Sequence, residues 1–253
     1  MIAIPLSFCC NVSCLTAPCL AAGPHSPTEK GWELIQYHAV QKRMGVRITS
    51  KGIRLDSLNA SWSIVSEAPK WDAVVFSKAD KTICWVPYAT WSKVGFTVID
   101  AGDDLEVTPT APSVQAAAMP IGGYKSLPVN VVRWQGPAPA LGGFMFQSKA
   151  QPTMCEFTFV TSRAIQAPLQ VAQLLNQFYR LPRVGGIPIR LSVSSEQRAM
   201  METLAIKSTQ LSSAIFDLPT NYKRVKTEQQ VLVNAKDRQK ITDFGQLLGA
   251  PEK

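Results

Sequence analysis

The chain has 253 residues, a formal net charge of +8, and 46% hydrophobic against 17% charged residues. This length is enough for one large β domain or two small ones. The low charged fraction and the 18 prolines argue against a helical bundle and favour β structure with many turns. The basic balance fits an anionic partner such as phospholipid headgroups, and colloidal solubility explains it equally well.

The first residues predict a processing segment rather than part of the fold. Residues 1–24 carry no charged side chain, and Cys19 and Ala21 have the spacing of the small residues at which signal peptidases cleave. No Lys or Arg follows Met1, so the positive start of a signal peptide is missing. We expect a cleaved signal peptide over residues 1–23, with a retained anchor as the alternative, and export of the chain to the periplasm or cell envelope.

The cysteines divide into two groups. Four of the six lie within residues 1–23, where Cys14 or Cys19 is a candidate for lipidation, although the residues before each fit a bacterial lipobox poorly. The rest of the chain contains Cys84 and Cys155. In an oxidising compartment these two could form one disulfide, and two buried thiols are the alternative.

Residues 44–160 predict an antiparallel sheet, because apolar and polar residues alternate with period two between short turns. Hairpins are expected over 46–56 and over 71–86, where the turn is rich in lysine. These connections are too short for parallel crossovers. The region near 100–143 is less regular, and its Ala-rich residues 116–119 favour one helical turn. Further strands are expected at 62–65, 129–134, 144–146 and 156–160.

The last third of the chain predicts two helices. Apolar residues at 171, 174, 175 and 178 share one face of a helix that Pro168 opens, and a second helix is expected over 236–248. Strands are expected at 187–193 and 200–207. The sum is a mainly β (α+β) fold in one domain over 24–253 with an irregular insertion near 100–143. Its sheet is a curved antiparallel sheet or half-open β-barrel with one mid-chain and one C-terminal helix.

Near the C-terminus, Phe216, Pro219, Asn221, Tyr222 and Lys223 follow an expected strand. This segment resembles the F-x-x-P-x-G-Y-K-like turn of periplasmic proteins related to the outer-membrane lipoprotein carriers, with Asn at the position of Gly. The hairpin over 71–88 and the stretch 185–190 are similar as well. The resemblance implies a half-open barrel that is apolar inside, helices that form a lid, and lipid-modified proteins as cargo. It transfers no ligand-contacting residue to this chain.

Catalytic and metal-binding motifs are missing from the sequence. It contains only two histidines, His25 and His38, and it has no nucleophile elbow, zinc motif, phosphate-binding loop or dinucleotide fingerprint. The sequence therefore predicts no catalytic residue, no metal and no cofactor. Paired carboxylates of an envelope hydrolase are the alternative, because such residues need not be neighbours in sequence.

Aromatic residues are the candidate ligand-binding set. The pairs at 144/146 and 157/159 have i, i+2 spacing, which points both members to one face of a strand. As a group the aromatics exceed what one sheet face needs, so some could line a cavity in a curved sheet. Core packing is the alternative for each of them. The set is Trp62, Trp71, Trp85, Tyr88, Trp91, Phe144, Phe146, Phe157 and Phe159.

Basic residues near the C-terminus are candidates for contact with an anionic membrane surface, and a solvated face is the alternative. They are Lys223, Arg224, Lys226, Lys236 and Lys240. Nucleic acid is not expected as a partner, because basic and aromatic residues are not interleaved. We therefore expect an exported protein that binds a lipid, an acyl chain or another apolar ligand. The alternative is a cell-envelope interaction or structural module without a small ligand.

Overall fold

The computed structural model describes residues 27–96, 113–137, 154–194 and 199–233. The strands of its first half are β1 (Thr28–His38), β2 (Lys42–Ile48), β3 (Gly52–Ser57), β4 (Trp62–Glu67), β5 (Ala73–Ser77) and β6 (Thr82–Val86). Those of its second half are β7 (Ser113–Ile121), β8 (Tyr124–Pro137), β9 (Met154–Ser162), β10 (Ile187–Val193), β11 (Ala199–Ser212) and β12 (Lys223–Arg224). The helices are α1 (Tyr88–Val94), α2 (Leu169–Tyr179), the 3-10 helix η1 (Ser213–Phe216) and α3 (Gln229–Leu232).

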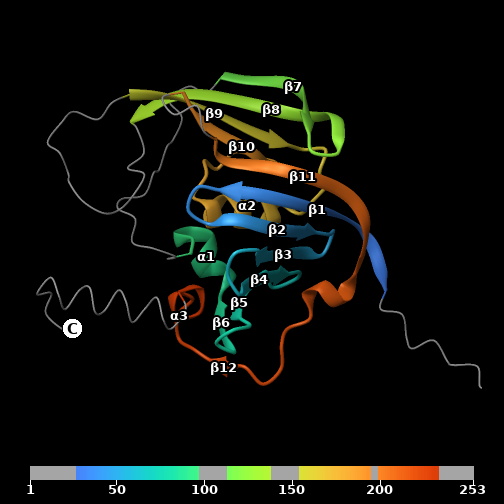
Figure 1. Ribbon diagram of the computed structural model, residues 1–253, viewed down its shortest axis with the longest axis vertical. Coiled ribbons are helices and arrows are strands. Elements are labelled where there is room, and N and C mark those ends of the chain that lie inside the picture. The colour runs from blue at the N-terminus through green and yellow to red at the C-terminus, as the bar shows by residue number, and fades with distance from the viewer. Residues whose placement is uncertain (1–26, 97–112, 138–153, 195–198, 234–253) are drawn as a thin grey trace, which may run out of the picture.

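All twelve strands form one curved, open sheet (Figure 1). The strand order is β12-β6-β5-β4-β3-β2-β1-β11-β10-β9-β8-β7. Neighbouring strands pair antiparallel, except that β12 pairs parallel with β6 over two residues. The expected mainly β fold with a curved antiparallel sheet is therefore confirmed. None of the described helices has the length and apolar run that a membrane span needs.

Helix α2 packs against one face of the sheet, which we call the inner face. Its residues Val171, Leu174, Leu175 and Phe178 are buried in the main core, as the predicted helical stripe requires. Arg180 ends the helix in the left-handed conformation, which lets its N–H reach the last carbonyls of the helix. The mid-chain helix is thus confirmed, and α1 and α3 also contribute buried residues to this core.

The opposite, outer face is covered at one end by the C-terminal segment. Phe216 of η1 packs with Val65, Phe76 and Ile83 in a second, smaller core, and Tyr222 meets the ring of Phe76 edge-on at 6.3 Å. Beside this core, charged side chains of β1, β2 and β3 are linked by ion pairs. Strands β3 to β6 are therefore packed on both faces.

The Ala-rich stretch 116–119 belongs to β7 and not to a helical turn. It pairs with residues 127–130 of β8 in a hairpin that turns at Gly122 and Gly123. Alanine favours helix by less than about 1 kcal/mol per residue, and strand pairing outweighs that preference here. The expected irregularity near 100–143 consequently does not hold for residues 113–137. The strand expected at 144–146 and the helix expected at 236–248 lie outside the described residues.

Candidate functional site

Most of the candidate aromatic residues belong to the core. Trp62, Trp71, Trp91, Phe157 and Phe159 are at most 9% exposed. The indole Nε1 of Trp91 donates to the carbonyl of Trp71 at 2.8 Å, and Trp62 meets the ring of Phe178 on α2 at 5.6 Å. Their rings therefore fill the space between the sheet and α2. Tyr88 of α1 is half-buried, and its hydroxyl donates to the side chain of Gln173 on α2. Phe144 and Phe146 lie outside the described residues.

Trp85 is the exception, because its side chain is 39% exposed. The guanidinium of Arg224 lies 4.9 Å from the centre of its ring. Lys223 and Arg224 form the edge strand β12, and Lys226 follows them, all three with exposed side chains. The structure thus brings Trp85 and these three basic residues, which we call the basic edge, to one border of the sheet. Lys236 and Lys240 lie outside the described residues.

Cys84 and Cys155 are both buried and are not joined by a disulfide. Cys84 lies on β6 and Cys155 on β9, and β5, β4, β3, β2, β1, β11 and β10 lie between them in the sheet. The disulfide interpretation is therefore wrong for this structure, and the alternative of two buried thiols holds. Burial raises the pKa of the Cys84 thiol, and nearby Glu228 raises it further. A raised pKa keeps the thiol protonated and makes it a poor nucleophile.

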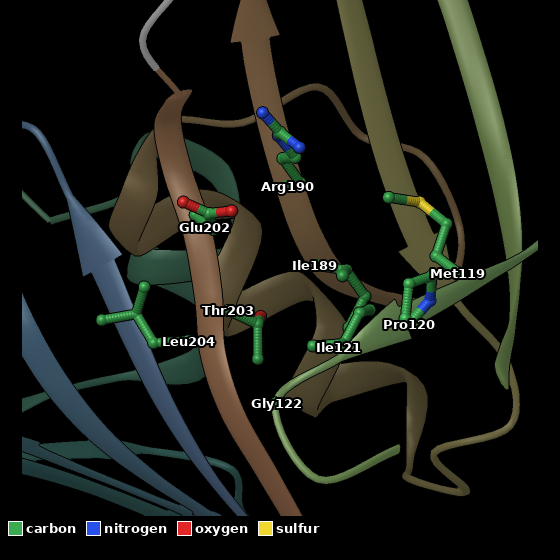
Figure 2. Close-up of a pocket in the computed structure, with 9 residues that line it drawn as sticks. All are labelled: Met119, Pro120, Ile121, Gly122, Ile189, Arg190, Glu202, Thr203 and Leu204. Carbon is green, nitrogen blue, oxygen red and sulfur yellow. The ribbon is translucent and has the colours of Figure 1, made fainter. Parts of the chain in front are cut away.

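A cavity of about 200 Å³ lies in the other half of the sheet, where β10 and β11 separate. These strands pair only between Arg190–Ser192 and Ala199–Glu202, so a wedge opens between them beyond Arg190. The end of β7 covers the wedge (Figure 2). We call this cavity the bulge pocket. Its lining residues are Met119, Pro120, Ile121, Gly122, Ile189, Arg190, Glu202, Thr203 and Leu204.

The three strands that line the bulge pocket are all irregular at the pocket itself. Ile189 is an extra residue in β10 relative to β9, and Leu204 is an extra residue in β11 relative to β1. The register of β7 with β8 shifts at Pro120. A β-bulge breaks strand pairing and re-aims side chains, and bulges gather next to functional sites. Three bulges around one cavity are therefore a structural reason to regard it as a site.

The tip of the β7–β8 hairpin closes the pocket on β11. The carbonyl of Gly122 accepts a hydrogen bond from the backbone N–H of Ile206 at 2.9 Å. A Cβ atom at Gly122 would overlap the carbonyl oxygen of Leu204, so this close approach requires glycine. Gly123 has φ of +97°, which glycine adopts without strain. The two glycines thus fix the hairpin tip against the bulge at Leu204.

Polar groups lie beside the apolar walls of the pocket. Arg190 of β10 and Glu202 of β11 are directly opposite each other and half-buried, and Figure 2 shows them next to the apolar Ile121 and Ile189. Within the described part of the chain, the buried Nε of Arg190 has no hydrogen-bond partner. An unsatisfied buried donor costs about 1–3 kcal/mol, so an acceptor on a bound molecule would remove that cost.

Gln36 of β1 bridges the wedge from behind. Its amide Nε2 donates to the carbonyl of Pro188 at 2.9 Å and to the hydroxyl of Thr203 at 3.1 Å. It therefore replaces a backbone hydrogen bond that β11 no longer supplies to β10. Its Oε1 is buried without a partner among the described residues. Polar and apolar groups thus line the pocket together, which suits a ligand with one apolar and one polar part.

None of the residues lining the bulge pocket was among the candidate site residues from sequence. A signal was present, because prolines inside strands mark bulges or edges, and Pro120 and Pro188 both lie in strands. Whether these prolines mark bulges, however, depends on how their strands pair with residues far away in the sequence. Among the residues that the structure describes, no group of three or more His, Cys, Asp or Glu side chains could hold a metal ion.

A scan against protein-family models gave no match for the sequence, and a search of curated proteins gave none either. Among solved structures, the chain is similar to a crystal structure of an uncharacterized conserved protein from Thermus thermophilus. That match has 12% sequence identity and a TM-score of 0.38, and it covers 78% of this chain and 90% of the other. The resemblance to lipoprotein carriers therefore stays a prediction.

Proposed function

We propose that this protein binds an apolar group, such as the end of an acyl chain, in the bulge pocket. The observation that supports the proposal is the pocket itself, with apolar walls from Met119, Ile121 and Ile189 beside Arg190. On the inner face, buried residues of α2 pack with the sheet in the main core, and Phe178 of α2 meets the ring of Trp62. The bulges that open the pocket cost strand hydrogen bonds, and a bound ligand is a physical reason for that cost.

The volume of the pocket limits the ligand. At about 200 Å³ it is smaller than the roughly 300–1,000 Å³ of pockets that enclose whole drug-sized molecules. A complete phospholipid does not fit, whereas one chain end does. A small pocket of this kind suits a short hydrocarbon group.

Arg190 gives the ligand a preferred charge. Its guanidinium can donate to a carboxylate or phosphate with the strength of a charge-assisted hydrogen bond, and its Nε has no protein partner within the described residues. Glu202 opposite Arg190 partly offsets the positive charge, so a single anionic group is preferred over a multiply charged one. The proposed ligand is therefore an amphiphile with one acidic head and one hydrocarbon tail.

The proposal also includes the location of the protein in the cell. We place the protein outside the cytoplasm, after cleavage within residues 1–23, with the basic edge facing an anionic membrane. Lys223, Arg224 and Lys226 would supply the attraction, at about 1 kcal/mol for each cation near such a surface. Trp85 fits this arrangement because indole rings favour the interface between lipid and water. Intact-mass analysis of the exported protein tests the cleavage directly.

Titration calorimetry with decanoate tests the pocket. Met119→Trp should block the cavity and abolish the binding heat, because the side chain of Met119 points into it (Figure 2). Met154→Trp is the control, because it makes the same exchange at an exposed methionine that is not among the lining residues of the pocket. Equal decanoate binding by both variants, or no binding by the unaltered protein, would reject the proposal.

The role of Arg190 has a separate test. Arg190→Gln should weaken decanoate binding by about 10- to 100-fold, the range that a hydrogen bond to a charged group provides. The same variant should bind decanol, which lacks the charge, as well as the unaltered protein does. Loss of both ligands together would mean that Arg190 supports the pocket structurally and does not read the head group.

A further inference from the structure

Strand β7 lies at one edge of the sheet, and its proline and its register shift lie only near its end, at Pro120. Among the described residues, only β8 pairs with it, so one row of its backbone N–H and C=O groups has no strand partner. Side chains from Val114 to Ala118 are exposed, and Val114 reaches 64% exposure. Residues 113–121 contain no charge. Natural edge strands are commonly blunted by lysine, proline or a cover, because a bare edge recruits another strand.

We propose that β7 pairs antiparallel with β7 of a second copy of this chain. The two molecules would be related by a twofold axis, and their sheets would join into one continuous sheet. This interface is independent of any ligand in the bulge pocket. Strand β7 is long and regular enough to pair with a second copy, because it has nine residues and its register with β8 shifts only at Pro120.

The sequence of β7 is compatible with itself in one particular register. With the twofold axis at Ala116, Val114 lies opposite Ala118 of the partner, Gln115 opposite Ala117, and Ala116 opposite its own copy. Residues directly opposite in an antiparallel pair share a face, so each larger side chain meets a small one. Pairing would run from residue 113 to residue 119. Pro120, which has no backbone N–H to donate, lies just beyond the last pair.

Electrostatic repulsion between the two copies is limited, although each chain carries a net charge of +8. The nearest exposed cations beside β7 are Lys125 and Arg133 on β8. The guanidinium of Arg133 reaches over β7 and donates to Oε1 of Gln115 at 3.3 Å. In the proposed register Gln115 faces Ala117 and not its own copy, and salt screens exposed charges with a Debye length of about 8 Å at physiological ionic strength.

A second copy fits the edge better than an unrelated peptide does. An unrelated segment would have to supply small, uncharged side chains in the right alternation, and β7 supplies that alternation itself. Val114 also loses its exposure against Ala118 of the partner, which removes an apolar side chain from water in both copies at once. Binding of an unrelated extended segment in place of a second copy is one outcome of the test below.

Sedimentation equilibrium of the full chain over a wide concentration range tests the proposal. We expect a reversible monomer–dimer equilibrium. Ala116→Lys places two ammonium groups opposite each other on the twofold axis and should weaken dimerisation by about tenfold or more. Ala60→Lys is the matched control, because it adds the same charge at an exposed alanine between β3 and β4, in the other half of the sheet, and should leave the equilibrium unchanged.

A charge pair tests the register. Ala118→Lys alone should weaken the dimer, whereas V114E/A118K should restore it, because a carboxylate then faces an ammonium in both symmetric pairs. Restoration would identify the register, since positions 114 and 118 do not oppose each other within one chain. A monomer at every concentration, or a dimer that Ala116→Lys leaves intact, would overturn the proposal. If the protein were monomeric, an extended segment of an unrelated protein would be the remaining candidate to pair with β7.

Discussion

The two halves of the sheet differ in regularity. From β1 to β6, each strand pairs with the next along the chain, and none of these pairings contains a register shift. In the other half, the β1–β11, β10–β11, β9–β10 and β7–β8 pairings each contain one. In the first half, β3 to β6 are packed on both faces. The second half contains the bulge pocket and the bare edge of β7.

The difference suggests that the first half of the sheet stabilises the fold and that the second half binds a ligand. Unbroken pairing between strands that are neighbours in sequence stabilises the first half, and α2 and the C-terminal segment add apolar contacts to it. Bulges give up some of that stability to re-aim side chains and open a cavity. We therefore expect substitutions in the first half to affect folding and those around the pocket to affect binding.

The largest effect should come from Trp91, which lies in the core beside α2. Trp91→Ala removes a side chain with 0% exposure and one of the two donors to the carbonyl of Trp71, which keeps the hydroxyl of Ser66, so it should cost about 3–5 kcal/mol of unfolding free energy. Trp85→Ala is the control. It loses an exposed ring and a cation–π contact of about 0.5–1 kcal/mol. Urea denaturation of both variants measures the difference, and equal costs would refute the core assignment.

His38 lies where the halves meet, and its titration should give the next largest effect. Burial, and to a lesser extent nearby Lys42, lowers its pKa from 6.5 to about 4. The unfolded chain therefore takes up a proton between these pH values while the folded protein does not. Its contribution to stability is fully present above about pH 6.5 and is lost as the pH falls towards 4, by roughly 3 kcal/mol in all.

The measurement is the unfolding free energy as a function of pH. His38→Asn is the comparison variant. The imidazole Nδ1 of His38 accepts hydrogen bonds from the backbone N–H groups of Val40 and Gln41, and the side-chain oxygen of Asn can accept them instead. The variant should be less stable at neutral pH but should show a flatter profile between pH 4 and 6.5. An unchanged slope in the variant would assign the pH dependence to other groups.

The sequence predicted the regular half well, and physical reasons explain why. Its hairpins over 46–56 and 71–86 are local, so alternation and turn residues carry the information. Strand β1 was not predicted, because polar Gln36 and His38 are buried while Ile35 is not, which disrupts the apolar alternation. The buried Gln36 is explained only by Pro188 and Thr203, which lie far along the chain.

The bulge pocket could not be predicted for the same reason. Leu204 is an extra residue only relative to β1, with which β11 pairs. No local sequence pattern specifies that pairing register. Periodicity located strands 187–193 and 200–207 correctly but gave no information about which of their residues are bulged. The aromatic residues were a natural choice for a binding site, yet α2 supplied the surface against which most of them pack.

Gly122→Ala tests the hairpin tip that closes the pocket. The added methyl would overlap the carbonyl of Leu204, so the tip must move, at a cost of about 1–3 kcal/mol. Decanoate binding should fall together with stability, because Gly122 lines the pocket. Gly185→Ala is the matched control, since its Cβ would meet only a guanidinium nitrogen of Arg163 at 3.7 Å. Binding that survives Gly122→Ala would place the ligand elsewhere.

The smallest effects should come from the ion pairs on the outer face. Asp56 accepts from Arg47 at 2.9 Å, from Arg54 at 2.9 Å and from Ser63 at 2.7 Å, and its side chain is only 17% exposed. Asp56→Asn should therefore cost about 1–2 kcal/mol, because hydrogen bonds to a partly buried carboxylate are lost or weakened. The unfolding midpoint in urea gives this value.

Glu33 provides the contrast at the other end of the same network. Its single contact with Arg47 is 3.4 Å long and both side chains are about 40% exposed, so water screens the pair. Glu33→Gln should change stability by no more than about 0.5 kcal/mol. If Glu33→Gln proved as costly as Asp56→Asn, the four charges would act as one cooperative network. The regular half would then depend on outer-face electrostatics as well as on its core.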